Sequence, residues 1–236
     1  EFVFGDWSSD VCSSDLNLSA CFSTTQTTTT STTSIDPTIA QFNQVKLILQ
    51  EFQTKEPNGF DYSAVQKNGD IVLNQMQVTQ RIDRQVPIKM MTEVQSLELN
   101  TFDVNHQFTP NNIVYYYRPN EIGVQENEGP VTWRSGTLSD YYHQAQPITS
   151  IEISVFEQIH FDIVGNETKF AGLIKPSEIR NVLMNQSPLP TQAAIQITYN
   201  HVTNQLTRIE ITLFHFSSST TIVFQPYWQA ATVVLP

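Results

Sequence analysis

Side chains that could bind a metal ion or catalyse a reaction are sparse in this sequence. His160 and Asp162 are two residues apart, so a strand would place both on one face. A zinc site takes three or four protein ligands, and the neighbouring sequence offers no third one. The five histidines form no H-E-x-x-H array, and the chain has neither a G-x-S-x-G elbow nor a glycine-rich phosphate loop. We therefore predict no catalytic residue, no metal site and no cofactor.

Tyr115, Tyr116 and Tyr117, together with Trp133, are the aromatic residues that could stack on a sugar. Aromatic residues are also common in ordinary strands with one face in the core, and we favour that interpretation. Aspartates and glutamates are scattered, and the sequence does not show whether two of them converge as in a glycosidase. An enzyme that acts on envelope glycans is kept as an alternative.

The most specific chemistry belongs to Cys21. Leu18-Ser19-Ala20-Cys21 has the order of a bacterial lipobox: an aliphatic residue, two small residues that fit the signal peptidase, and a thiol that takes a diacylglycerol. Two or more acyl chains anchor a protein stably to a membrane, whereas one chain binds only marginally. We predict that Cys21 is lipidated and attaches the protein to the extracytoplasmic side of the bacterial cell membrane.

The residues on either side of Cys21 are expected to lack a fold. Residues 23–34 are almost entirely threonine and serine, so they bury no apolar surface, and we assign residues 17–35 to a lipobox remnant and a disordered tether. Residues 1–16 contain no basic start and no apolar run of a signal peptide. Within them, "GDWSSDVCSSDL" (residues 5–16) resembles the in-frame translation of sequencing-adapter DNA. We expect residues 1–16 to be an artefact that replaces the native N-terminus.

The first folded element is predicted to be an amphipathic helix. Asp36 suits the N-cap and Pro37 the first helical position, while Glu56-Pro57-Asn58-Gly59 ends the helix. Apolar residues recur between them at helical spacing: Ile39, Phe42, Val45, Ile48, Leu49 and Phe52. Their expected role is core packing. A secondary role is to line a ligand groove, for which we name Ile39, Phe42, Val45, Leu49 and Phe52.

From about Asp70 the apolar residues recur every second position. Ile71 and Leu73 alternate, as do Met76 and Val78, and the slip between the pairs predicts a β-bulge. Further strands are expected in residues 111–119, 129–136, 150–164, 168–176, 195–199, 208–213 and 222–225. A short helix opens at Pro176, with Ile179, Val182 and Leu183 on its apolar face.

These elements predict an α+β domain over residues 36–236. Alternating strands indicate an antiparallel sheet with one buried and one solvated face, which the two helices would cover. The net charge of −11 excludes an electrostatic footprint for nucleic acid. No run of 18 apolar residues occurs, so no membrane-spanning helix is predicted.

Residues 36–236 resemble the LolA-like and LppX/LprG-like bacterial lipoproteins in the order of their elements. The order is lipobox, threonine-rich tether, helix, long meander, the unit "FAGLIKPSEIRNVL" and two final hairpin strands. The resemblance implies a curved antiparallel half-barrel with helices on its concave face. It also implies that acyl chains are carried in the apolar space between sheet and helices.

The expected protein is therefore a non-enzymatic, monomeric, membrane-anchored lipoprotein that binds a lipid or another hydrophobic ligand. One alternative is a structural or interaction module of the cell envelope whose core is filled. The other is the envelope glycan-acting enzyme. The sequence identifies neither the ligand nor a protein partner, and an open apolar space beneath the first helix would favour the lipoprotein carrier.

Overall fold

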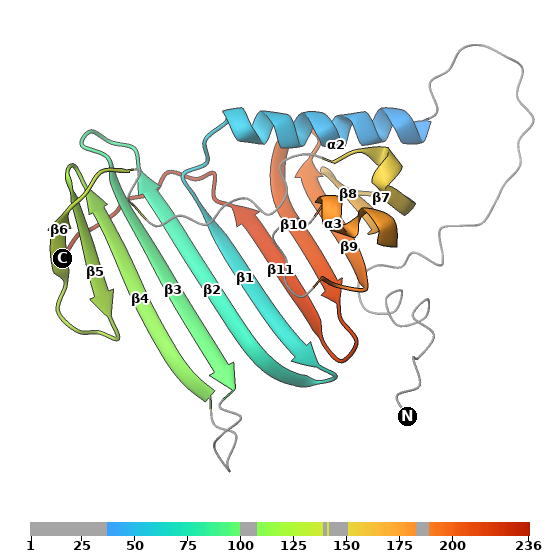
Figure 1. The fold of residues 1–236 in the computed structure, drawn as a ribbon. Helices are drawn as coiled ribbons and strands as arrows, with labels where there is room; N and C mark the ends of the chain where they lie inside the picture. Colours follow the sequence, from blue (N-terminus) through green and yellow to red (C-terminus); the bar gives the residue numbers. More distant parts are fainter. Residues whose placement is uncertain (1–36, 100–107, 139–140, 142–150, 183–188) are drawn as a thin grey trace, which may run out of the picture.

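A computed structural model describes residues 37–99, 108–138, 141, 151–182 and 189–236 (Figure 1). The adapter-like segment, Cys21, the tether, the predicted N-cap Asp36 and Leu183 lie outside the described residues. No helix in the described ranges is both long enough and apolar enough to cross a membrane.

The predicted amphipathic helix is confirmed as α2 (Pro37–Thr54). Phe42, Val45, Leu49 and Phe52 are buried on the face that packs against the sheet, as is Ile48. Ile39 is 44% exposed, so its expected place on the buried face is wrong. At about 100° per residue, Ile39 points roughly 120° away from the centre of that face. Four of the five residues assigned to a ligand groove thus face the sheet.

The strands form one open antiparallel sheet with the order β6-β5-β4-β3-β2-β1-β11-β10-β9-β8-β7. Their bounds are β1 (Gly59–Asn68), β2 (Ile71–Asp83), β3 (Lys89–Leu99), β4 (Phe108–Arg118), β5 (Glu121–Glu126), β6 (Thr132–Ser135), β7 (Phe156–Val164), β8 (Glu167–Ile174), β9 (Gln192–Asn200), β10 (Gln205–Phe214) and β11 (Ser219–Pro226). The predicted large antiparallel sheet is confirmed. Because β6 and β7 stand at its two ends, the sheet is not closed, as a half-barrel requires.

The centre of the sheet is the pairing of β1 with β11, the first and last strands of the chain. Phe60 lies opposite Pro226 and Tyr62 opposite Phe224. Two meanders, β1–β6 and β7–β11, thus extend in opposite directions from this seam. The sequence had indicated a simple meander and no strand at β1.

Two local expectations have different outcomes. The predicted bulge is present, because Gln66 pairs with Asn74 whereas Lys67 pairs with Val72, which leaves Leu73 as the additional residue of β2.

The strand expected from residue 150 is wrong in its first part, since Ile153–Val155 form the 3₁₀ turn η3 and β7 begins at Phe156. Ile151 is buried but Ile153 is exposed, so alternate spacing there does not mark a strand face.

The side of the sheet that packs against α2 is here called the inner face. The hydrophobic core on this face consists of the buried side chains of α2 and of every second residue of the central strands. Tyr62, Val78, Ile197 and Ile209 are among these strand residues. The short helix is confirmed as η4 (Pro176–Glu178) followed by α3 (Ile179–Val182), and Ile179 is buried in the same core. Both helices therefore cover the inner face, and no helix in the described ranges packs against the outer face.

Strand direction places several turns at one edge of the sheet. The β2–β3 turn (residues 84–88), the β7–β8 turn (165–166) and the β9–β10 turn (201–204) all lie at this edge, because their strands alternate in direction. Figure 1 shows α2 lying along the same edge. We call it the α2 edge and the other one the far edge, where the β1–β2 turn (69–70) and the β10–β11 turn (215–218) lie.

Candidate functional site

A largely apolar opening on the inner face lies where α2 ends. It is a pocket of about 450 Å³ between the last turn of α2, strands β1 to β3 and Leu138. Its lining consists of Phe52, Glu56, Pro57, Gly59, Phe60, Gln80, Ile82, Arg84, Ile88, Met90 and Leu138. Ligand pockets of proteins are commonly about 300–1,000 Å³ and mostly apolar, and this pocket meets both criteria.

Two charged residues that line the pocket, Arg84 and Glu56, are paired with each other. Arg84 donates from Nε to Asn58 Oδ1 at 3.0 Å and from its two terminal nitrogens to Glu56 Oε2 at 2.7 Å and the carbonyl oxygen of Pro57 at 2.9 Å. The Glu56 carboxylate offsets the charge of this guanidinium, so an anionic ligand would meet little net positive charge here. The pocket is therefore suited to an apolar chain rather than to an anionic group.

Beside the pocket, a small polar network is buried beneath the inner face. Gln80 Nε2 donates to Thr92 Oγ1 at 3.0 Å, and the hydroxyls of Tyr141 and Thr92 are 2.9 Å apart. The Tyr141 hydroxyl is also 3.1 Å from the carbonyl oxygen of Tyr115. Burial raises the pKa of the Tyr141 phenol well above its ordinary value of 10.0. The network therefore keeps a neutral phenol beside the pocket and fixes the position of Gln80.

Of the predicted groove residues, only Phe52 lines this pocket. Phe42 packs edge to face against Phe156 and Phe170, with ring centroids 5.9 and 5.5 Å away. Val45 and Leu49 are likewise enclosed by the core. The space under most of α2 is thus filled by side chains, and the opening lies at the C-terminal end of the helix.

Sequence reasoning missed most of the pocket. Phe60 lies on β1, which was not expected, and Ile82 and Met90 face each other across the β2–β3 pair. The alternation of Phe60 and Tyr62 with Asp61 and Ser63 is a signal that could have revealed β1. No local pattern brings Leu138 to this place, because it arrives from a segment beyond β6.

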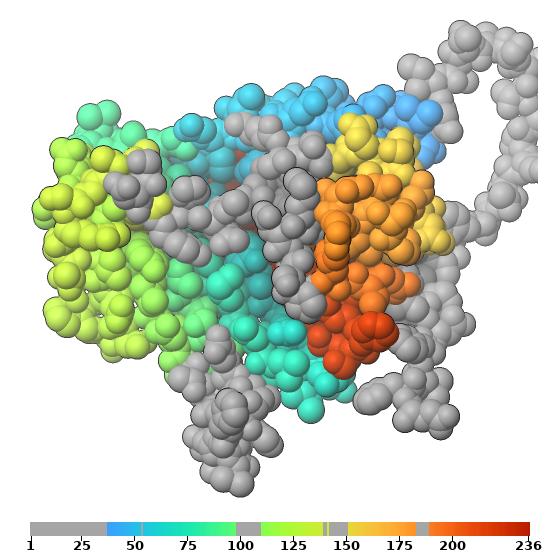
Figure 2. Space-filling model, in the orientation of Figure 1, coloured from blue at the N-terminus to red at the C-terminus, as the bar shows by residue number. Residues whose placement is uncertain are grey.

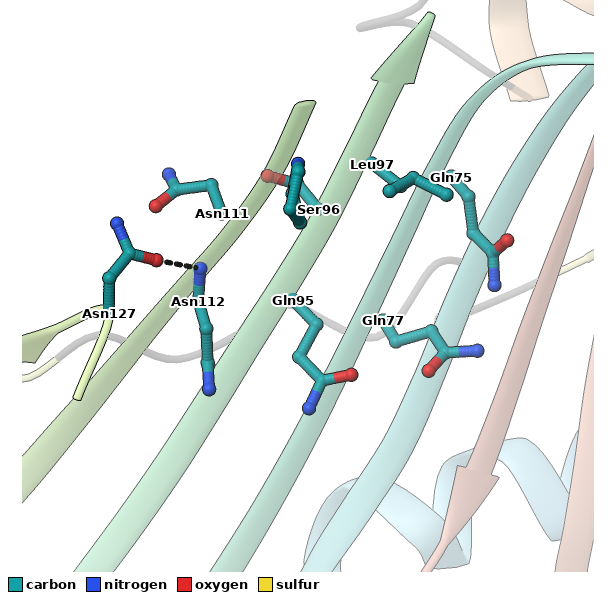
Figure 3. Close-up of a pocket in the computed structure, with 9 residues that line it drawn as sticks. Gln75, Gln77, Gln95, Ser96, Leu97, Asn111, Asn112 and Asn127 are labelled. Atoms are coloured by element: carbon teal, nitrogen blue, oxygen red, sulfur yellow. Dashed lines mark hydrogen bonds between the residues drawn. The ribbon is translucent and has the colours of Figure 1, made fainter. Parts of the chain in front are cut away.

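The outer face carries a pocket of different chemistry, of about 290 Å³, near the far edge (Figure 3). Gln77, Gln95 and Asn112 lie side by side on β2, β3 and β4. Gln95 and Asn112 both donate to Glu93 Oε1, at 2.8 and 3.2 Å. Among the described residues that line the pocket there is no aspartate, glutamate or histidine. The lining offers amide groups for hydrogen bonds, and the Glu93 carboxylate beside it is held by two of them.

The aromatic residues proposed as a sugar platform are divided between the two faces. Tyr116 lies on the outer face with Trp133, with ring centroids 6.4 Å apart, whereas Tyr117 packs against Tyr141 on the inner face. The guanidinium of Arg118 lies 4.1 Å from the centre of the Trp133 ring. Burial and the nearby Glu93 carboxylate raise the pKa of Tyr116. These rings pack as ordinary strand aromatics, the interpretation favoured by the sequence.

His160 and Asp162 do lie on one face of β7, the outer one, as their spacing predicts. Asp162 helps to line a polar pocket of about 390 Å³ with Glu167, Lys169 and Arg208. Both carboxylates are exposed, and the lining mixes them with the cationic side chains of Lys169 and Arg208. Within the described ranges, no three histidine, cysteine, aspartate or glutamate side chains gather into a metal-binding group.

Comparison with known proteins gives a likeness of fold alone. No protein-family model matches the chain, and no curated protein matches it in sequence. Among solved structures, its fold is similar to that of LprF from Mycobacterium bovis. The alignment covers 82% of this chain and 96% of LprF, with 8% identity and a TM-score of 0.41. Membership of the family expected from the sequence stays a prediction.

Proposed function

We propose that the protein is a non-enzymatic lipoprotein that holds an acyl chain or another hydrophobic ligand in the pocket at the end of α2. It acts as a monomer on the extracytoplasmic side of a bacterial membrane, to which acylated Cys21 anchors it. The observation that carries the proposal is the apolar lining of that pocket, formed by Phe52, Phe60 and Ile82 among others. The resemblance of the sequence to LolA-like and LppX/LprG-like lipoproteins supports the same function.

The mechanism is exclusion of an apolar chain from water. Each methylene transferred from water to an apolar surrounding contributes about 0.8 kcal/mol. The Arg84 guanidinium is engaged by Glu56 and Pro57, so the pocket selects by apolar contact rather than by charge. No nucleic acid is proposed as a partner, because a net charge of −11 repels a polyanion.

The experiment is native mass spectrometry of the full chain carrying Cys21→Ser, produced in bacteria and purified without detergent. Removal of the thiol prevents acylation, so any bound mass is a non-covalent ligand. The expected result is a mixture of bare protein and protein with one lipid or fatty-acid mass. A bare chain in every preparation, together with no uptake of a fluorescent fatty acid, would contradict the proposal.

A second function is supported by the packing beneath the N-terminal part of α2. Phe42, Val45 and Leu49 fill the space there, as a structural module with a closed core would require. In that case the same experiment yields only bare protein, and the fluorescent fatty acid does not bind. The two functions are thus separated by one measurement.

A further inference from the structure

We propose that the α2 edge is a docking surface for a lipid bilayer, which the protein contacts with its own side chains as well as through an acyl anchor. The inference deepens the proposed function and rests on it, because it states where the pocket meets its source of ligand.

Exposed large apolar side chains are concentrated at this edge. The described residues include thirteen of them, and eight lie on the α2 edge or on the outward side of α2. These eight are Ile39, Leu47, Val86, Ile88, Leu138, Ile163, Val164 and Val202, of which Val164 also lines the polar pocket of the outer face. Val86 is the most exposed of them, at 95%, and Val202 is 67% exposed. Single exposed apolar residues are common, whereas their accumulation along one edge is what a surface that contacts an apolar partner requires.

Hydrogen bonds hold the turns of this edge in defined positions. Asp83 accepts from the backbone N–H of Gln85 at 3.1 Å at the start of the β2–β3 turn. In the β9–β10 turn, Asn200 Oδ1 accepts from the N–H groups of Val202 and Thr203 at 2.9 and 3.0 Å. The β7–β8 and β9–β10 turns are tied together, since the N–H of His201 donates to the carbonyl oxygen of Asn166 at 3.0 Å. The apolar side chains are thus presented by ordered turns.

α2 continues this surface. Gln44 Nε2 donates to Asn204 Oδ1 at 3.3 Å, so the helix contacts the β9–β10 turn directly. Leu47 lies one helical turn beyond Gln44, and Ile39 lies two turns before Leu47 on the same exposed side. Figures 1 and 2 show α2 and the β2–β3 turn along the upper edge of the molecule. The surface therefore extends over the length of α2 and on to the β2–β3 turn.

The charges at this edge largely cancel each other. Lys55 is paired with Glu51, Arg84 with Glu56 at 2.7 Å, and Arg118 with Glu121 at the β4–β5 turn, which strand direction also places at this edge. The strand ends at the same edge also carry one further cation, Lys89, and two further carboxylates, Asp83 and Glu167. The edge is thus close to neutral although the whole chain carries a charge of −11. A neutral apolar surface matches a zwitterionic bilayer, whereas a negatively charged one would be repelled by anionic lipids.

Two further features of the edge agree with a bilayer as the occupant. The hydrophobic pocket opens here, since Arg84, Ile88 and Leu138 belong to its lining. Residues 1–36, with the predicted lipidation at Cys21, precede α2, which lies along this edge. An acyl chain leaving the bilayer would therefore reach the pocket across apolar side chains.

The test is flotation of the full chain carrying Cys21→Ser with phosphatidylcholine vesicles, so that no covalent anchor contributes. The test variant is Val86→Asp with Val202→Asp on the α2 edge. The matched control is Ile71→Asp with Phe216→Asp on the far edge, where the side chains are 61% and 85% exposed. The test variant is expected to lower the partition coefficient about tenfold or more, because two apolar side chains become charged. The control is expected to leave it unchanged, and about 1 M salt is expected to have little effect.

The proposal is overturned if Cys21→Ser protein does not float, if both double variants float equally, or if flotation needs anionic lipid and is abolished by salt. It is also overturned if sedimentation shows a dimer that only the α2-edge substitutions dissociate, because the surface would then bind a second copy. Uptake of a fluorescent fatty acid without vesicles separates this inference from the proposed function. Protein that takes up the probe but does not float retains the pocket and lacks the docking surface.

Discussion

The rings of Phe42 and Phe170 meet edge to face, with centroids 5.5 Å apart and planes inclined at 71°. Phe42 belongs to α2 and Phe170 to β8, which the order of the sheet places far from the β1–β2 strands where the helix ends. The contact therefore fixes the N-terminal part of α2 over the β7–β11 half of the sheet. It leaves the C-terminal turn of the helix to cover the seam and the pocket beside it.

Replacement of Phe42 by alanine is expected to lower the free energy of unfolding by about 3–5 kcal/mol, because a buried aromatic side chain is lost and a cavity remains. Urea denaturation followed by circular dichroism measures the change. Leu47→Ala on the exposed side of the same helix is the control, and it is expected to change stability by less than about 0.5 kcal/mol. Equal effects of the two substitutions would contradict the packing described here.

The sequence predicted the elements whose signals are local. The apolar residues of α2 recur at helical spacing, and Ile209, Ile211 and Leu213 of β10 alternate with polar residues, so each pattern reveals its own element. Even the bulge at Leu73 was visible as a slip in alternation. Pairing between distant strands is different, because neither β1 nor β11 records in its own residues which strand lies beside it.

The candidate site was predicted less well than the fold, and the reason is again distance along the chain. The helix residues named for a groove were correctly placed against the sheet, apart from Ile39. Which of them line an opening depends on how well the opposite side chains fill the space. Phe156 and Phe170 fill it beneath Phe42, whereas Phe60, Ile82 and Met90 leave it open near Phe52.

Gly123→Ala is expected to destabilise the outer side of the sheet by about 1–3 kcal/mol, as overpacking does. A Cβ at this position would lie 2.9 Å from Val131 Cγ1 and 3.1 Å from Cε3 and Cζ3 of Trp133. Trp133 lies opposite Gly123 across the β5–β6 pair, and its ring covers the glycine. Denaturant unfolding measures the loss.

A double variant tests the physical reason. Trp133→Leu removes the ring that a Cβ would meet, so the cost of Gly123→Ala should fall when both changes are combined. The double-mutant cycle gives the coupling between the two positions directly. If the changes in the free energy of unfolding of the two substitutions were strictly additive, contact with the Trp133 ring would not be the reason for a glycine at position 123.

Alkaline pH is expected to destabilise the protein partly through Tyr141. Burial raises the pKa of this phenol in the folded state, whereas the unfolded chain has the ordinary value of 10.0. Above pH 10 the unfolded state loses a proton that the folded state retains, so the free energy of unfolding falls as pH rises. Below pH 10 the phenol is protonated in both states, so its contribution to the free energy of unfolding is fully present. Thermal unfolding at a series of pH values checks the trend.

Tyr141→Phe provides the control for this titration. At neutral pH it should cost about 0.5–1.5 kcal/mol, because the hydrogen bonds to Thr92 and Tyr115 are lost. The fall in stability above pH 10 should then be shallower than in the unchanged protein. Tyr116 and Tyr199, whose pKa values burial also raises, are present in both proteins and cancel in the comparison. Identical slopes would assign the alkaline loss to other groups.

Ile82→Gln is expected to weaken binding of a hydrophobic ligand about tenfold, because an apolar wall contact worth about 1.5 kcal/mol is replaced by an amide. Ile82 lies in the pocket lining beside Met90, and glutamine has a similar length, so the fold should be preserved. Displacement of a fluorescent fatty acid from the full-length Cys21→Ser protein measures the affinity.

The matched control for Ile82→Gln is Ile71→Gln, the same substitution at the other end of β2, where the side chain is exposed at the far edge. This variant should bind the probe as the parent does, and both variants should unfold at similar denaturant concentrations. If the two variants lose affinity to the same extent, the probe binds outside the pocket. If neither loses affinity, the apolar lining at Ile82 is not where the ligand lies, and a site elsewhere on the chain must hold it.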